Sequence, residues 1–322
     1  MAPDTGTPRP RIARAPTAWQ RGFDVAFKAA SHAFGAAVVV LLGLIVIEVM
    51  RHAGAAMSDY GLGFLTSSVW DANRAEFGIF PEIAGTLYTS LLALLVAGFL
   101  GITVALVLSQ GFVSKRWELL MKNIIELLAA IPSVVYGLWG IFVLVPLLRE
   151  PSAWLNEHFG FLPFFSTRLS GPGILPASLV LAVMILPTVT AISREAMAAV
   201  PPRLAAAAYG LGATRWEVIF RVTIPTASAG IFGALVLGLG RAFGETMALA
   251  MLAGNANVFS WSLSSPGNTL AALLANHFPE AGKVEIGALM YAAAVLLLIT
   301  LTVNILGSLI MARATAGLKG LH

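Results

Sequence analysis

The chain has 322 residues, of which 58% are hydrophobic and 11% are charged, with a mean hydropathy of +0.84. A soluble domain carries about 25% charged residues, so this composition predicts an integral membrane protein and excludes an ordinary soluble enzyme. The absence of cysteine excludes disulfides, thiol catalysis and cysteine-ligated metals. The net charge of +4 is interpreted as the excess of Lys and Arg that orients a protein in the membrane, and not as a sign of nucleic-acid binding.

Six apolar segments predict six membrane-spanning helices, because each approaches or exceeds the roughly 20 residues that cross about 30 Å of hydrocarbon. Residues 1–31 are rich in Pro and Arg and are expected to form a cytoplasmic N-terminal tail. Pro132 and Pro187 mark expected kinks or re-entrant points. The membrane domain is expected at 32–312 and a cytoplasmic C-terminal tail at 313–322. The expected spans are 33–50, 84–108, 127–148, 173–192, 227–253 and 286–311.

The distribution of Lys and Arg predicts the orientation of these spans. With the N-terminus inside, 14 of the 20 Lys and Arg fall on the inner side, five fall on the outer side, and Arg241 lies within a span. Since Lys and Arg concentrate in cytoplasmic loops, both termini are expected in the cytoplasm.

Two connecting segments are too long to be simple turns. The outer segment 51–83 carries Asp59, Asp71, Glu76 and Glu82 and is expected to form a short structured cap. The inner segment 193–226 contains an alanine run, a glycine break and an amphipathic stretch that is expected to end at Pro225. Such a cytoplasmic helical hairpin is suited to docking into a groove on another protein.

Several chemistries are excluded by the motifs that the sequence lacks. It has no P-loop pattern for ATP and no H-E-x-x-H or close His pair among its five histidines, so no catalytic residue, bound cofactor or metal is expected in this chain. Gly233, Gly240 and Gly244 fall on one stripe of the expected fifth span and predict close helix packing.

Arg241 and Glu245 stand four residues apart inside the fifth apolar segment. An arginine near the middle of the membrane costs roughly 2.5–3.5 kcal/mol, so it must be paired or face a polar cavity. One interpretation is an intrahelical salt bridge that holds helices in register. The other is that Arg241 offers a planar cation to a translocating oxyanion, while Glu245 weakens the attraction so that the anion is released.

The inner segment resembles the cytoplasmic "EAA" loop of permease subunits of ABC importers, in which E-A-A, three residues, Gly, nine residues and I-x-L-P follow one another. Ala206, Ala207, Ala208, Gly212 and Pro225 occupy these places, with Ala206 in place of the glutamate. The resemblance implies the six-helix permease fold of type I (MetI-like) importers. It also implies that the loop contacts the ATPase through these five residues and Arg215, Glu217 and Arg221.

Three stretches, "FLTSSVWDANRAEFGIFPEIAGTLYTSLLALLVA", "AAIPSVVYGLWGIFVLVPLL" and "GLGRAFGETMALAMLAGN", resemble the PstC-type permease of the bacterial high-affinity phosphate importer. The resemblance implies a non-catalytic subunit of the inner membrane that forms half of a pathway for inorganic phosphate. It implies four kinds of partner: a second, PstA-type permease, two ATPase subunits that hold ATP and Mg²⁺, an extracytoplasmic phosphate-binding protein that meets the outer loop, and the membrane. It places Arg241 and Glu245 in the pathway, where Thr246 and Ser133 are expected to donate hydrogen bonds.

Alternative functions remain open on the sequence alone. In an ion-coupled secondary transporter Glu245 would be the titrating site, although no internal inverted repeat is visible. A non-transporting scaffold or an intramembrane enzyme would leave the inner loop unexplained. The carried oxyanion need not be phosphate, because an arginine recognises charge and geometry.

Overall fold

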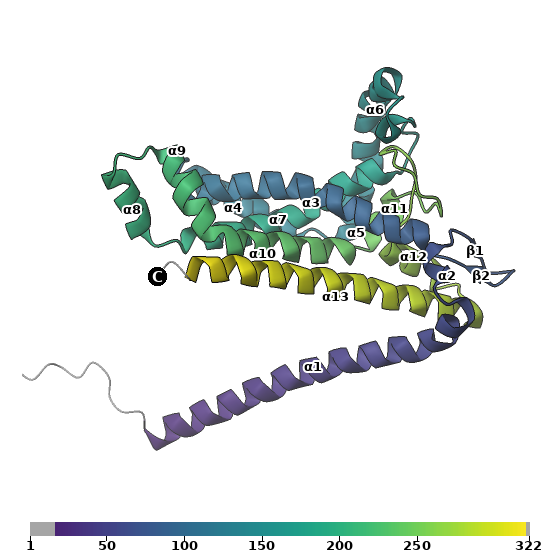
Figure 1. Cartoon of the computed structure of the whole chain (residues 1–322), viewed down its shortest axis with the longest axis horizontal. Coiled ribbons are helices and arrows are strands. Elements are labelled where there is room, and N and C mark those ends of the chain that lie inside the picture. The colour runs from purple at the N-terminus through teal and green to yellow at the C-terminus, as the bar shows by residue number, and fades with distance from the viewer. Residues whose placement is uncertain (1–16, 320–322) are drawn as a thin grey trace, which may run out of the picture. The chain divides into compact units, whose positions relative to one another are not determined.

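The computed structural model describes residues 17–319, with side chains described to residue 313. The chain divides into two units, residues 1–51 and 52–322, and the helix α1 (Ala18–Tyr60) runs across the boundary (Figure 1). Six helical segments of the described residues are long and apolar enough to cross a membrane, which confirms the prediction of a six-span all-α protein. These are residues Ala18–Tyr60, Phe80–Ser109, Ser133–Phe159, Ile174–Ala198, Arg215–Phe243 and Lys283–Arg313.

The two expected tails are helical where the structure describes them. Residues 18–31 belong to α1, and α13 (Lys283–Lys319) continues past residue 312; residues 1–16 and 320–322 lie outside the described part. Residues 18–31 of the expected N-terminal tail are thus part of a long helix. Trp19, Phe23 and Phe27 recur every four residues between charged side chains, and this spacing supports an amphipathic helix even where the composition is too polar to span a membrane.

Helix α7 (Ile174–Ala198) lies between α3 (Phe80–Ser109) and α10 (Ile224–Phe243) at the centre of the second unit (Figure 1). Val189 of α7 is fully buried. A Cβ atom on Gly101 would lie 3.1 Å from Val189, and one on Gly238 would lie 2.9 Å from it. The two glycines therefore let both α3 and α10 pack closely on α7.

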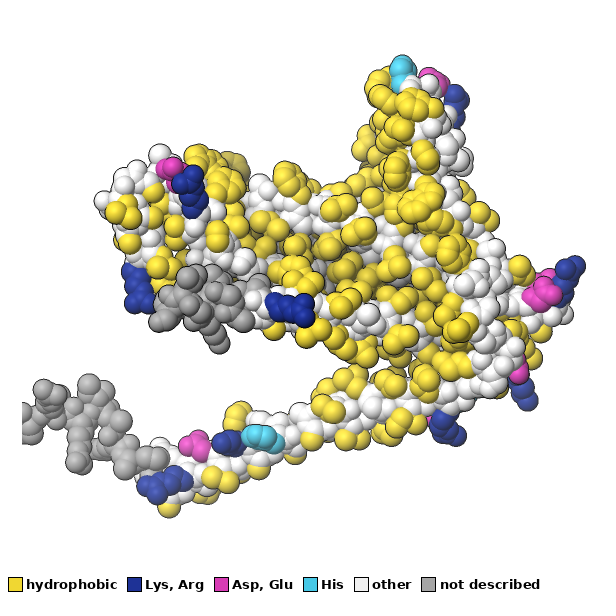
Figure 2. Space-filling model, viewed as in Figure 1, with side chains coloured by type: hydrophobic (Ala, Val, Ile, Leu, Met, Phe, Trp, Pro, Cys, Tyr) yellow, Lys and Arg dark blue, Asp and Glu magenta, His cyan; other side chains and the backbone are white. Residues whose placement is uncertain are grey.

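Apolar side chains cover much of the outer surface of the long helices, and the visible charged side chains lie mainly toward the ends of the second unit (Figure 2). Leu91, Leu95 and Phe99, one turn apart on α3, are 54%, 62% and 74% exposed. A soluble protein rarely leaves so large an apolar surface uncovered. This surface is the one expected of helices that contact lipid or other membrane subunits.

The third expected span, 127–148, is interrupted. Helix α4 (Lys115–Ala130) ends before Pro132, α5 (Ser133–Trp139) begins after it, and a π-helical segment η1 (Gly140–Leu144) leads into α6 (Val145–Phe159). Helix α6 projects away from the bundle (Figure 1). The break expected at Pro132 is confirmed. Pro187, by contrast, lies inside the uninterrupted α7, so it is not a re-entrant point.

A second π-helical segment, η3 (Ile219–Thr223), connects the short α9 (Arg215–Val218) to α10, so that one helix runs from Arg215 to Phe243. The expectation that the amphipathic stretch ends at Pro225 was wrong. A proline normally breaks a helix because it lacks an N–H and its ring meets the carbonyl of the preceding turn. Each π segment ends two residues before a proline, Pro146 or Pro225, and its wider turn makes room for the ring.

Residues 52–83 fold into a cap that packs on α13. It comprises the end of α1, α2 (Gly63–Thr66) and the paired strands β1 (Trp70–Asp71) and β2 (Glu76–Phe77). Phe64 stacks on Tyr291 of α13 with ring centroids 4.4 Å apart. Glu82, expected in the loop, lies in the first turn of α3 and is fully buried. The same unit also contains the 3-10 turn η2 (Pro163–Phe165) and α12 (Leu270–His277).

Candidate functional site

The fifth expected span, 227–253, is discontinuous at the residues that the sequence singled out. Helix α10 ends at Phe243 and α11 (Met247–Leu252) begins after a break of three residues, 244–246. Gly244 follows the end of α10, its N–H donating to the carbonyl of Arg241 at 3.2 Å, and the N–H of Glu245 donates to Ala242 at 3.3 Å. The prediction of one continuous helix was wrong, because this tight turn, with glycine as the capping residue, ends it inside an apolar run.

Arg241 lies in the last turn of α10 and is exposed within this chain. Its Nη1 donates a hydrogen bond to Oγ1 of Thr188 on α7 at 3.0 Å. A cation at the C-terminal end of a helix interacts favourably with the helix dipole. Because a guanidinium has five N–H donors in a fixed plane, this one bond orients the group and leaves further donors for a ligand.

Glu245 lies in the break and is half-buried. Its Oε1 accepts a hydrogen bond from the N–H of Ala248 in the first turn of α11, at 3.4 Å. The ion pairs of the described residues include none between Arg241 and Glu245. The interpretation of an intrahelical salt bridge was therefore wrong: the helix ends between the two residues, so they do not occupy successive turns of one helix.

Thr246 and Ser133, the two expected hydroxyl donors, lie on different elements. The Thr246 hydroxyl donates to the carbonyl of Gly244 at 3.0 Å, within the break. Ser133 begins α5, which packs against α11: a Cβ on Gly137 would meet Ala248 and Met251, and one on Gly140 would meet Leu252. These contacts follow the same order along both segments, so Ser133, one turn before Gly137, lies on the side of the break.

A cavity of about 410 Å³ opens beside the break. Gly244 and Thr246 line it together with apolar residues of α12 and α13, namely Ala271, Leu274, Ala275, Phe278, Pro279 and Leu296. The break thus joins a cation, a carboxylate and hydroxyls within an otherwise apolar unit, which is the arrangement expected of a polar path through a membrane.

The predicted glycine stripe has two members within α10. A Cβ on Gly233 would lie 3.2 Å from Met311, and one on Gly240 would lie 3.7 Å from Asn304, both on α13. Gly244 follows the end of the helix, so its place in the stripe was wrong. Gly238, which the sequence analysis did not select, makes a closer approach than Gly233 or Gly240, since a Cβ there would lie 2.9 Å from Val189 of α7. Its partner helix α7 is 40 residues or more away in sequence, and no local signal marks it.

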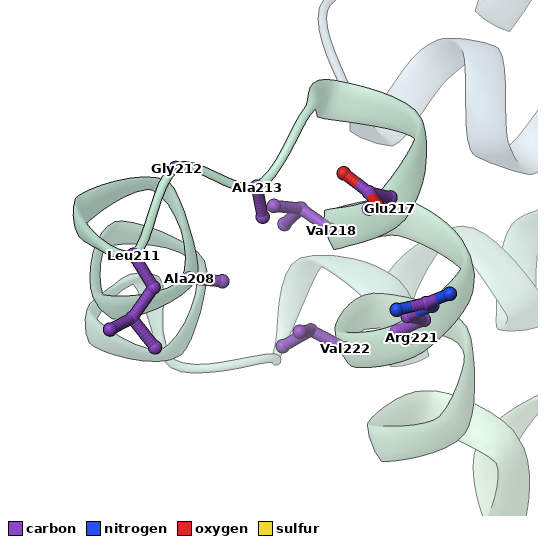
Figure 3. Close-up of a pocket in the computed structure, with 8 residues that line it drawn as sticks. All are labelled: Ala208, Leu211, Gly212, Ala213, Glu217, Val218, Arg221 and Val222. Atoms are coloured by element: carbon purple, nitrogen blue, oxygen red, sulfur yellow. The ribbon is translucent and has the colours of Figure 1, made fainter.

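The inner hairpin consists of α8 (Pro202–Gly210), a turn, and α9. Gly212 has a φ of +86°, a conformation that favours glycine. Thr214 and Glu217 form a reciprocal capping box at the start of α9. Ala206 and Ala207 are exposed and Ala208 is half-buried. Figure 3 shows the pocket of about 340 Å³ between the two arms, with Ala208, Val218 and Val222 directed toward it and Glu217 and Arg221 at its side.

Arg215 fixes this hairpin to the loop between α3 and α4. Its Nη2 donates to the carbonyl of Gln110, and its guanidinium lies over the ring of Phe112, 3.9 Å from the centroid. Trp216 packs against the same ring at 5.3 Å. Arg215 and Glu217 therefore have partners inside this chain. Leu211, at the tip of the hairpin, is 90% exposed and was not predicted as a contact residue.

Comparisons with known proteins agree with this architecture. Residues 97–317 match the family described as "binding-protein-dependent transport system inner membrane component". The phosphate transport system permease protein PstC of Xylella fastidiosa is 38% identical over 296 residues, covering 90% of this chain and 91% of the relative. PstC of Haemophilus influenzae is 38% identical over 300 residues, covering 91% and 95%.

Solved structures support the fold at low sequence identity. A bacterial alginate ABC transporter, in complex with an alginate pentasaccharide-bound periplasmic protein, matches with a TM-score of 0.57 and 17% identity, over 89% of this chain and 97% of that one. The MetNI methionine ABC transporter in an inward-facing conformation matches with a TM-score of 0.54 and 15% identity, over 73% and 95%. With its six apolar helices and its matches to ABC permeases, the protein is a multi-pass protein of the inner membrane. The chain belongs to the binding-protein-dependent transport system inner membrane components and, among these, to the PstC-type permeases.

Proposed function

We propose that this chain forms half of the translocation pathway for inorganic phosphate in an ATP-driven importer. The observation that carries the proposal is the single helix from Arg215 to Phe243, because it joins the inner hairpin to Arg241. The two arginines are 26 residues apart, which corresponds to about 39 Å of helix. A movement imposed on the hairpin is therefore delivered at the end that carries the cation.

The proposed partners are a second, PstA-type permease, two ATPase subunits and an extracytoplasmic phosphate-binding protein. Arg241 is exposed within the single chain, and a second permease would close the pathway around it. The ATPase would bind ATP and Mg²⁺, so this chain is a non-catalytic subunit and needs no cofactor of its own. The exposed apolar tip of the hairpin, with Leu211 and Tyr209, supports a protein contact there.

The proposed orientation has both termini in the cytoplasm. The excess of Lys and Arg in the segments 1–31, 109–126, 193–226 and 313–322 supports it. In this orientation the hairpin faces the ATPase. The folded cap of residues 52–83 then faces the extracytoplasmic side, where the binding protein delivers its ligand.

At the break, Arg241 is proposed to bind phosphate through the N–H groups that Thr188 leaves free. A planar guanidinium pairs with two oxygens of a tetrahedral oxyanion at once. Glu245 places a negative charge beside the path, which weakens the attraction and favours release. Ser133 and Thr246 are proposed to donate hydrogen bonds, Thr246 after its hydroxyl turns away from Gly244.

Uptake of radiolabelled phosphate tests the proposal in cells that lack other phosphate importers and co-express the partner subunits. Losing one charge-assisted contact of about 1.5–3 kcal/mol predicts that Arg241→Ala lowers the uptake rate at least tenfold at an equal membrane level. Arg313→Ala, an exposed arginine on α13, is the control and keeps normal uptake. Normal uptake by Arg241→Ala would remove the site from the proposal.

Two further arms test the driving force and the cargo. Substitution of the P-loop lysine in the co-expressed ATPase is expected to abolish uptake; persistent uptake would instead support an ion-coupled transporter. Excess unlabelled phosphate is expected to suppress the labelled uptake, whereas excess sulfate is not. Equal suppression by both would show that the pathway serves oxyanions in general.

A further inference from the structure

Thr188 differs from other hydroxyl residues of the membrane helices in the bond that it makes. The hydroxyls of Thr86, Thr89 and Thr103 donate to the carbonyl four residues earlier in their own helix, at 2.6–2.7 Å, which is the usual arrangement. Oγ1 of Thr188 instead accepts a hydrogen bond from Nη1 of Arg241, across 53 positions of sequence. The geometry points to a role for Thr188 at the site rather than in its own helix.

We propose that Thr188 is a positioning residue that holds the Arg241 guanidinium in the plane required to receive the translocated oxyanion. The proposal rests on the proposed function, because it assigns to Thr188 the orientation of the cation that this function needs. Without the bond, the long side chain of an exposed arginine samples many rotamers, and ordering it again when the anion binds costs conformational entropy. With the bond, the remaining N–H donors are ordered before the anion arrives.

The backbone around the pair supports this role. Val189, the next residue on α7, is fully buried and lies at a close approach of α10, 2.9 Å from the position of a Cβ on Gly238. Gly238 is three residues, nearly one helical turn, before Arg241. The contact between the two helices therefore fixes the separation of Thr188 and Arg241, and a hydrogen bond between side chains on two such fixed backbones needs little further ordering.

Thr190 provides a matched control on the same helix. It is also a threonine, it is 1% exposed, and its hydroxyl has no hydrogen-bond partner in the described part of the chain. Replacement of either threonine by valine removes one hydroxyl and preserves the shape of the side chain. Any general effect of losing a polar atom from α7 is therefore common to both variants, whereas the loss of the bond to Arg241 occurs only in Thr188→Val.

The test compares the maximum rate and the half-saturation concentration of phosphate uptake in the importer with all its subunits. From the strength of a hydrogen bond to a charged group, Thr188→Val is expected to lower the maximum rate about tenfold. Its half-saturation concentration is expected to stay unchanged, because the extracytoplasmic binding protein captures the ligand. Thr188→Ser, which keeps the hydroxyl, should recover most of the rate, and Thr190→Val should stay within about twofold of the parent.

Each result bears on a separate claim. Normal uptake by Thr188→Val at an equal membrane level, or failure of Thr188→Ser to recover the rate, overturns the positioning role. If Thr188→Val does not accumulate, Thr188→Ala is the second hydroxyl-free variant, and the same comparison applies to it. Uptake lost in Arg241→Ala but normal in the hydroxyl-free variants rejects only the role of Thr188. Normal uptake in Arg241→Ala removes Arg241 from the proposed pathway and the role of Thr188 with it, whereas loss of the proposed function itself would show as the absence of phosphate uptake by the parent importer.

Discussion

Arg215 and Arg241 lie near opposite ends of one helix, which runs without interruption through α9, η3 and α10. Arg215 also holds the loop between α3 and α4 through Gln110 and Phe112. The same helix thus contacts the loop that follows α3 at its cytoplasmic end, in the proposed orientation, and presents the cation at its other end. A force on the hairpin would reach both α3 and the site.

The contacts of Arg215 with Gln110 and Phe112 form a clamp that is expected to hold the hairpin in place. Arg215→Ala removes a hydrogen bond and a cation–π contact, together worth about 1–2 kcal/mol at an exposed site. Local opening of residues 193–226 is therefore expected to rise at least fivefold, measured as the rate of limited proteolysis in inside-out membranes. Arg203→Ala, an exposed arginine on the same hairpin, is the control. Equal cleavage of both variants would show that the clamp does not hold the hairpin.

The backbone conformation at Gly212 predicts that an alanine is tolerated less well there than at the nearby Gly210. Gly212 has a φ of +86° and nothing within 4 Å of an added Cβ, so Gly212→Ala is opposed only by backbone strain, about 1–2 kcal/mol. Gly210 also has open space around it but belongs to α8, so Gly210→Ala is expected to stabilise the hairpin slightly. Co-isolation with the partner ATPase measures both. A Gly210→Ala loss as large as that of Gly212→Ala would contradict the argument.

Much of the fold follows from the sequence, because the length of an apolar run and the requirement to satisfy the backbone in lipid leave few solutions. The break at Pro132 is also a local signal. The break at 244–246 has no such local signal. A glycine in an apolar run, such as Gly244, can either extend a packing stripe or end a helix, and only the tertiary context decides that it ends the helix here. The continuation of the helix through Pro225 depends on the π turn of residues 219–223, and no residue pattern in the sequence predicts that turn.

The candidate site likewise contains residues that the sequence identifies and one residue that it does not. Arg241 and Glu245 are visible in the sequence because charges are costly in a membrane. Thr188 is not distinguished there, because hydroxyl residues are common in the spans and most bond their own helix. Its contact with Arg241 depends on how α7 and α10 approach each other, and Gly238, which permits that approach, is one of several glycines in the segment.

Gly238 and Gly240 are expected to differ in their tolerance of a methyl group. A Cβ on Gly238 would lie 2.9 Å from buried Val189, whereas one on Gly240 would meet Asn304 at 3.7 Å, an ordinary contact. Gly238→Ala is therefore expected to lower the free energy of unfolding by about 1–3 kcal/mol, and Gly240→Ala by much less. Thermal melting of the purified importer in detergent measures the difference. Similar melting temperatures for the two variants would mean that α7 and α10 are not closely packed there.

Glu245 combines two functions that substitution can separate. Its carboxylate accepts the N–H of Ala248 at the start of α11, and in the proposed function its charge weakens the hold on phosphate. Glu245→Gln keeps an oxygen acceptor and removes the charge, so α11 is expected to remain intact while the anion stays longer near Arg241. Glu245→Ala removes both, which adds a loss of roughly 1 kcal/mol of helix capping.

The maximum rate of phosphate uptake separates these effects of Glu245. The rate in Glu245→Gln is expected to fall several-fold, because the negative charge of Glu245 repels the anion and the release step loses this repulsion in the variant. Melting of Glu245→Gln should match the parent, whereas Glu245→Ala should melt earlier. An uptake rate in Glu245→Gln equal to or above that of the parent would mean that the charge does not promote release, since the capping oxygen is retained in that variant.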